Sequence, residues 1–171
     1  MNPSVKSNLS CTGQISKMWR IFSVNDDSVI EIRCIDPKGG QVLSKLFRAP
    51  NYESIEDLQR AVEAFAIETN KRGYNIYIVM NPIRPETESG SAKDADILKR
   101  RLLLIDIDRT QKATCPANDE ELQAAKDLAN TIEDYLREQR WDLFAKVMSG
   151  NGYHLYYRLD DLDNTPEMTA S

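Results

Sequence analysis

The central motif of the sequence is Arg101-Leu102-Leu103-Leu104-Ile105-Asp106-Ile107-Asp108, in which an apolar run leads directly into Asp-x-Asp. A continuous apolar run of this length predicts a strand that is buried on both faces. Because side chains alternate along a strand, Asp106 and Asp108 should point to the same side. Two neighbouring carboxylates repel each other, and a divalent cation such as Mg²⁺ commonly stabilises such a pair. The motif therefore predicts either a metal site or a strand that runs into an acidic turn.

The composition is that of a soluble globular protein with one domain and a sizeable core. The 171 residues are 41% hydrophobic and 29% charged. No apolar run approaches the roughly 18 residues of a membrane span, and no signal peptide opens the chain, so we expect a cytoplasmic protein with no membrane partner. The net charge of −5 argues against coating of nucleic acid by bulk charge but permits a local basic groove. The three cysteines lack disulfide or zinc spacing and are expected to be reduced thiols.

Apolar periodicity and turn signals around the central motif predict an α+β fold. Ser54 is the expected N-cap of one helix, and Gly73 is expected to end it. We expect a mixed or antiparallel sheet with the helices packed mainly on one face, and no element after Asp160. The expected strands cover residues 29–35, 42–47, 76–80, 144–148 and 153–159, and the expected helices cover 15–22, 54–72 and 118–140.

Two polar segments precede the central motif. Residues 83–95 form a connection that is longer than usual between two expected buried strands, and long connections are often functional or mobile. Lys99, Arg100 and Arg101 then stand directly before the apolar run. They are either a solvated strand start or, for Arg100 and Arg101, phosphate or template contacts beside a metal site.

A second motif, Ser149-Gly150-Asn151-Gly152-Tyr153-His154, connects two expected strands and contains the single histidine of the chain. The glycines let the backbone bend and let a ligand approach closely. Backbone amides in such a turn can hold an anion, and Ser149 and His154 add side-chain donors. The motif is therefore either a phosphate-binding hairpin or a plain hairpin whose histidine makes an ordinary hydrogen bond.

The two motifs together resemble the archaeo-eukaryotic-type primase-polymerase superfamily, in particular the RepB-like primase domains of phage and plasmid replication proteins. An hhhDhD strand followed about 40 residues later by a strand–SGNGxH–strand hairpin is more specific than either part. The resemblance covers residues 14–162. It also includes, in order, Val29–Arg33, Asn75–Pro82 and Lys93–Ile97 ahead of the central motif.

The resemblance implies an RRM-like sheet and a DNA primase or polymerase activity in phage or plasmid replication. Asp106 and Asp108 would hold two Mg²⁺ or Mn²⁺ ions, and the nucleotidyltransferase would transfer the nucleotidyl group of an NTP or dNTP to a primer 3′-hydroxyl on a single-stranded DNA template, with pyrophosphate as the leaving group. Ser149 and His154 would bind the phosphates of the incoming nucleotide. Gly150, Asn151 and Gly152 complete that turn. A replicative helicase, as a further region or a separate protein, is the other implied partner.

One feature of the family is missing from this sequence. The family places a third metal-binding aspartate on a strand after the histidine hairpin, and no such hhD pattern follows here. We therefore expect a flexible tail at 1–12, a catalytic domain at 13–162 that is incomplete at its C-terminal end, and a polar tail at 163–171.

Two other functions fit parts of the sequence. A catalytically dead nucleotide-binding or nucleic-acid-binding remnant would account for the missing acid. A phosphohydrolase of the haloacid-dehalogenase type would use the DxDxT pattern at Asp106-Ile107-Asp108-Arg109-Thr110, but it predicts a parallel α/β sheet and leaves the histidine hairpin unexplained.

Overall fold

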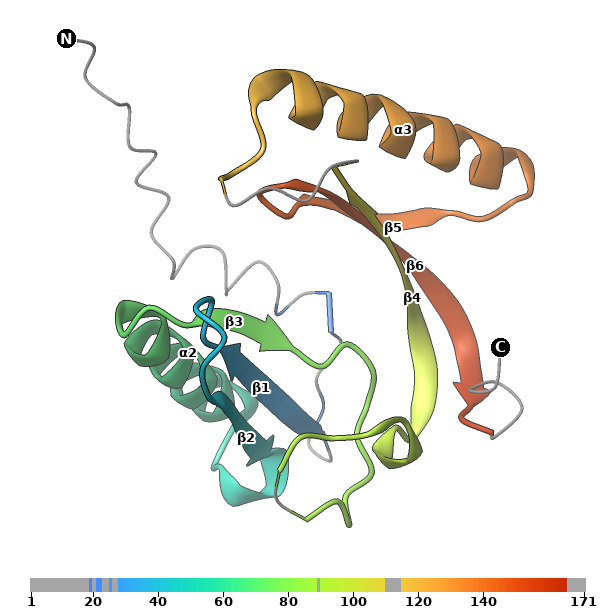
Figure 1. Ribbon diagram of the computed structural model, residues 1–171. Helices are drawn as coiled ribbons and strands as arrows, with labels where there is room; N and C mark the ends of the chain where they lie inside the picture. Colours follow the sequence, from blue (N-terminus) through green and yellow to red (C-terminus); the bar gives the residue numbers. More distant parts are fainter. Residues whose placement is uncertain are drawn as a thin grey trace, which may run out of the picture. The chain divides into compact units, whose positions relative to one another are not determined.

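The structure is a computed structural model that describes residues 19, 21–22, 25, 28–88, 90–109 and 115–165. These residues form two compact units. The first comprises the described residues up to Lys99 together with those from Asn164 on, and the second spans Arg100–Asp163. In the described part of the chain, each unit contains one three-stranded antiparallel sheet and one α-helix (Figure 1). The predicted α+β class is confirmed, and the strands pair antiparallel, which is one of the two expected arrangements. The strands belong to two sheets and not to one.

The first unit is a sheet with strand order β2-β1-β3 and a helix on one face. Its elements are β1 (Val29–Ile35), β2 (Val42–Arg48), α2 (Ile55–Lys71) and β3 (Asn75–Ile78). Apolar side chains of α2 pack against those of β1 and β2, with Leu58 and Cys34 fully buried between them. The predicted ends of α2 are confirmed. Ser54 is the N-cap, since its Oγ accepts the Asp57 amide at 3.1 Å, and Gly73 follows the helix with φ +95°.

The expected buried strand at 76–80 was wrong in bounds and in environment. β3 covers Asn75–Ile78, and its side chains alternate between exposed and half-buried. The reason is that β3 lies at the edge of the sheet and α2 covers only one face.

The long connection after β3 is held tightly to its own unit. Its ends are joined by an antiparallel bridge between Ile83 and Ile97, both of which are buried. A short 3₁₀ helix, η2 (Asp94–Asp96), precedes that bridge, and another, η1 (Ala49–Asn51), follows β2. The Arg48 side chain also donates to backbone carbonyls of this connection, including Pro85 O at 2.6 Å.

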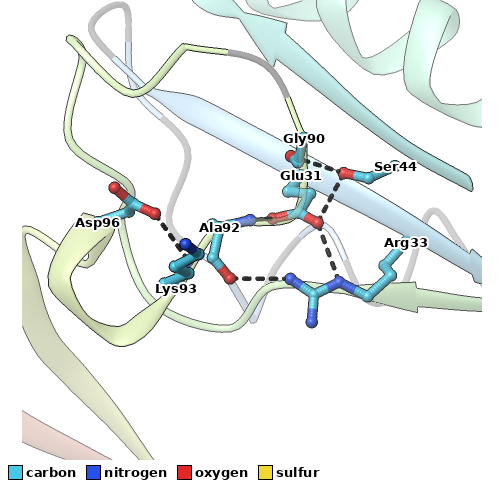
Figure 2. A network of polar contacts seen from close by, with 7 residues as sticks. All are labelled: Glu31, Arg33, Ser44, Gly90, Ala92, Lys93 and Asp96. Carbon is cyan, nitrogen blue, oxygen red and sulfur yellow. Dashed lines mark hydrogen bonds and ion pairs between the residues drawn. The ribbon is translucent and has the colours of Figure 1, made fainter. Parts of the chain in front are cut away.

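A buried carboxylate fastens the middle of the same connection (Figure 2). Glu31 is fully buried on β1, on the side opposite α2 because its neighbours Ile30 and Ile32 face the helix. Its Oε2 accepts the Ala92 amide at 2.8 Å, and its Oε1 accepts Ser44 Oγ at 2.7 Å and Arg33 Nε at 3.0 Å. Residues 83–95 are therefore a structural loop that hydrogen bonds hold to the sheet of the first unit.

The second unit has strand order β4-β6-β5, with α3 on one face. Its elements are β4 (Lys99–Asp108), α3 (Asp119–Glu138), β5 (Leu143–Met148) and β6 (Gly152–Asp163). Asn118 caps α3 through a capping box with Glu121, at the start of the helix expected over 118–140. In the core between helix and sheet, the buried side chains of α3 are small and those of the strands are large. The buried residues are Ala125 and Ala129 on α3, Ile107 on β4, and Leu155 and Tyr157 on β6.

The expectation that the central motif forms a strand buried on both faces was wrong. β4 is an edge strand of an antiparallel sheet, and Leu103 remains 37% exposed. Ile105 and Ile107 pack with the α3 core, so the alternating residues Asp106 and Asp108 lie on the opposite face of the sheet. The expectation of no element after Asp160 was also wrong, since β6 continues to Asp163.

Several predictions lie wholly or partly outside the described residues, namely the tail at 1–12, most of the helix at 15–22 and the end of the tail at 163–171. Trp19 is described, and it packs against the core of the first unit. Cys34 and Cys115 are free thiols, while Cys11 is not described. Among the helices described, none is long and apolar enough to cross a membrane. One catalytic domain over 13–162 stays a prediction.

Candidate functional site

The second unit brings the two sequence motifs together on the face of its sheet opposite α3. Arg101 pairs with Asp161 near the end of β6, and the Ile107 carbonyl lies against Gly152 at its start, so β4 and β6 run antiparallel. In this register His154 lies beside Asp106, with 3.3 Å between His154 Nε2 and Asp106 Oδ1. Two residues that are 48 positions apart in the printed sequence thus share one point of the sheet.

His154 stands between an acid and a phenol. Its Nδ1 is 3.4 Å from the Tyr156 hydroxyl, two residues along β6 on the same face. Burial raises the pKa of Tyr156, and the negative charge of Asp106 raises it further, so the phenol keeps its proton at neutral pH. A protonated phenol can donate to Nδ1, which would place the ring proton on Nε2, toward Asp106. From the sequence, Tyr156 was assigned no role, although its (i, i+2) spacing from His154 was a signal for one.

Asp108 lies at the end of β4, on the same face as Asp106. Two positions along a strand separate these residues by about 7 Å. The Asp108 Oδ1 accepts the Arg109 amide at 3.0 Å. The Asp106 side chain is 63% exposed, so one carboxylate is open to a ligand beside the half-buried His154 ring.

The turn of the histidine hairpin is formed for structural reasons. Gly150 has φ +105°, and the Ser149 amide donates to the Gly152 carbonyl at 3.0 Å. Gly152 has no positive φ, yet a Cβ there would lie 1.9 Å from the Ile107 carbonyl oxygen. The second glycine is therefore required by the close approach of β4, whereas the sequence suggested the approach of a ligand.

Asn151 connects this turn to α3. Its Oδ1 accepts the Ala117 amide at 3.1 Å, directly before the N-cap of the helix. Ser149, Gly150 and Asn151 are exposed. The predicted nucleotide-binding residues of the turn thus lie next to the end of β4. Asn151 also holds the segment directly before α3.

Arg100 and Arg101 do not join this site. From Asp106 they are six and five residues away along β4, which corresponds to about 17–20 Å. Arg101 makes a two-point contact with Asp161, at 2.9 Å from Nε and 3.2 Å from the terminal nitrogen. The two arginines therefore lie apart from the acidic pair along β4, and a phosphate or template contact by them stays a prediction.

The residues at the site fit a divalent ion that is held partly by substrate. Mg²⁺ is commonly bound by one or two protein carboxylates and completed by phosphate oxygens and water. Asp106 and Asp108 supply two carboxylates on one face. Among the described residues no group of three or more histidine, cysteine, aspartate or glutamate side chains is placed to bind a metal ion.

Comparison with known proteins yields no relative. No protein-family model matches the chain, and no curated protein and no solved structure matches it either.

Proposed function

We propose that the chain carries the catalytic face of a metal-dependent nucleotidyltransferase of the primase-polymerase type, which extends a primer on single-stranded DNA. The observation that supports the proposal is the distance of 3.3 Å between Asp106 Oδ1 and His154 Nε2. A single Mg²⁺–triphosphate complex would have to reach from the two acids to the histidine. This requires the carboxylates to lie within about 10 Å of the imidazole ring.

The acids, the histidine and the tyrosine would have different chemical roles. Mg²⁺ or Mn²⁺ bound by Asp106 and Asp108 would lower the pKa of the primer hydroxyl and neutralise charge on the α-phosphate. His154 would donate from Nε2 to a phosphate oxygen of the incoming nucleotide. Tyr156 would hold the imidazole in the tautomer that makes this donation. Because the Asp106 carboxylate is exposed, it could turn to an incoming ion, which would release the Nε2 proton of His154 for the phosphate oxygen.

The antiparallel sheet argues against the phosphohydrolase alternative. A haloacid-dehalogenase-type enzyme places its first aspartate on a parallel, doubly wound sheet. Here Asp106 lies on the edge strand of an antiparallel sheet. The catalytically dead remnant remains the second candidate, because no hhD pattern follows the histidine hairpin in the sequence, where the resemblance implies a third metal-binding aspartate.

The test is primer synthesis from labelled nucleotides on a single-stranded template with Mg²⁺ or Mn²⁺. Asp106→Asn and Asp108→Asn should each lower product by at least about 100-fold, because the charge that stabilises the transition state is lost. Asp127→Asn is the matched control, since Asp127 is exposed on α3, the element that covers the opposite face. Its product yield should stay within about twofold of the original.

A binding measurement separates the two candidates. His154 is the single histidine, so its ring signals can be followed by NMR without assignment. Mn²⁺ should broaden these signals in the original chain and not in the Asp106→Asn, Asp108→Asn double variant. Broadening without product supports the remnant and overturns the enzymatic proposal, and the absence of both overturns the metal site itself.

A further inference from the structure

The second unit has a hollow at the edge of its sheet, apart from the acidic pair. Its volume is about 560 Å³, and it forms where β6 continues beyond the start of β5. The paired register of these strands ends at Leu143 and Tyr157, so the following part of β6 faces the segment that leads from α3 into β5. The polar and aromatic residues that line the hollow are Arg140, Trp141, Asp142, Phe144, Arg158 and Asp160.

Trp141 supplies an open aromatic surface in this hollow. Its side chain is 39% exposed, although indole is a large apolar group. The ring is held edge-on to the buried Tyr157, with 6.1 Å between centroids and an interplanar angle of 73°. A fixed and exposed indole is a suitable platform for stacking a flat ligand.

A second planar group lies across the same hollow. The Arg158 guanidinium carbon is 3.9 Å from the centroid of the Phe144 ring. A guanidinium that stacks on an aromatic ring keeps its charge and its donors, and its outer face remains available for a further flat group. Arg158 is exposed, which leaves that face accessible.

Arg140 has a backbone conformation that a glycine would adopt more easily. It has φ +66° at the C-terminal end of α3, where the Arg140 amide donates to Arg137 O and the Trp141 amide donates to Leu136 O, both at 2.9 Å. This pattern is a Schellman motif, in which glycine is usual at the left-handed position. An arginine costs about 1 kcal/mol more there. A cost of this kind at a lining residue suggests that the side chain is used.

The charges define the ligand more closely. Arg140 and Arg158 are balanced by Asp142 and Asp160, so the hollow as a whole does not attract a polyanion strongly. Stacking surfaces together with donors and acceptors fit an unpaired nucleobase, whose amino groups can donate to the carboxylates. The guanidinium groups would contact the phosphates on either side of that base.

The position along β6 relates the hollow to the acidic pair. Arg158 follows His154 by four residues on the same face of the strand, which corresponds to about 13 Å. That is the length of about four nucleotides that rise about 3.4 Å each. We infer that the hollow binds an unpaired base of the single-stranded DNA template. This inference rests on the proposed function, which it deepens by assigning a template subsite.

Tryptophan fluorescence tests the inference directly. The chain has two tryptophans, so in a Trp19→Phe background Trp141 is the sole reporter. A single-stranded DNA of about 12 nucleotides, within the usual range of site sizes, should quench this fluorescence in a saturable manner without metal. The same sequence as a duplex should quench it much less, because its bases are paired.

Arg140→Gly is the decisive variant. It removes the guanidinium but suits the left-handed backbone, so stability should be unchanged or higher. Affinity for the single strand should fall by about fivefold to tenfold, and the slope of log K against log salt should become shallower by about 0.7. Arg137→Ala is the control, since Arg137 lies in the last turn of α3, is half-exposed at 59% and pairs with Glu133. It should bind within about twofold of the original.

The outcomes separate this inference from the proposed function. Trp141→Ala, measured by anisotropy of a labelled DNA, should also weaken binding, whereas the Asp106→Asn, Asp108→Asn double variant should bind normally. If Arg140→Gly and Trp141→Ala bind like the original chain, the template subsite is wrong, whether or not primers are made. If both weaken binding while no primer is made, the subsite stands and the enzymatic proposal fails.

Discussion

Replacing Glu31 with glutamine should destabilise the first unit more than any exposed change of the same kind. Glu31 is fully buried, and its carboxylate accepts three hydrogen bonds in one network (Figure 2). Glutamine has the same shape but presents an NH₂ group where one carboxylate oxygen stood. At that position a donor would face another donor, either the Ala92 amide or the Arg33 guanidinium.

The magnitude follows from these contacts. A buried donor that is left unsatisfied costs about 1–3 kcal/mol. The ion pair with Arg33 adds at most about 1 kcal/mol, because the Arg33 side chain is 31% exposed and therefore screened. We expect the free energy of unfolding of this unit to fall by about 2–4 kcal/mol. Glu31→Ala, which also removes the acceptor for Arg33 and Ser44, should cost about 3–5 kcal/mol.

The assay uses the distribution of the tryptophans. Trp19 packs in the first unit, so urea unfolding followed by fluorescence in a Trp141→Phe background reports on that unit. Amide exchange of Ala92 should also become faster, because the unit is less stable and because its hydrogen bond at 2.8 Å to residue 31 is lost wherever the NH₂ group faces it. Glu68→Gln is the control, because Glu68 is exposed on α2, and it should change stability by less than about 0.5 kcal/mol. A loss below about 1 kcal/mol for Glu31→Gln, with Ala92 still protected, would refute the reasoning.

Two further predictions concern the second unit, with unfolding followed by Trp141 in a Trp19→Phe background. Gly152→Ala should lower stability by about 3 kcal/mol or more, because its Cβ would lie 1.9 Å from the Ile107 carbonyl oxygen. Gly150→Ala, with open space but φ +105°, should cost only about 1–2 kcal/mol, and equal losses would contradict the crowding argument. The Lys146 hydrogen bond lowers the pKa of Glu133 below its usual 4.5, so their contact stabilises the fold above that pH and is lost as the pH falls through the folded pKa. Lys146→Met should therefore lower the urea midpoint at neutral pH and flatten its decrease below pH 4.5, and an unchanged acid dependence would count against this pair.

Local signals in the sequence were sufficient for most helix ends and for the two hairpins. Ser54 accepts the amide three residues later, and Gly73 ends the helix with a positive φ, so both depend on atoms within one helical turn. The strands on either side of Ser149-Gly150-Asn151-Gly152 were likewise visible from alternation and turn residues. Such interactions are encoded within a few positions, which is why the sequence alone predicts them.

The candidate site was predicted in part. The acids and the histidine were singled out by spacing and by resemblance. The arginines before the strand were assigned to phosphate or template contacts, and the structure places them about 17–20 Å from Asp106 along β4. Arg101 pairs with Asp161, which is 60 positions later in the chain. No local pattern announces such a partner, because it depends on which strand lies beside β4.

The sequence by itself therefore determined the types and approximate ends of the elements, and it singled out Asp106, Asp108 and His154. Only the tertiary structure decided that the strands belong to two antiparallel sheets and that β4 is an edge strand. It also showed why Gly152 must lack a side chain. The physical reason is that strand neighbours, burial and crowding arise from contacts between residues far apart in the chain, whereas caps, turns and alternation arise from residues close together.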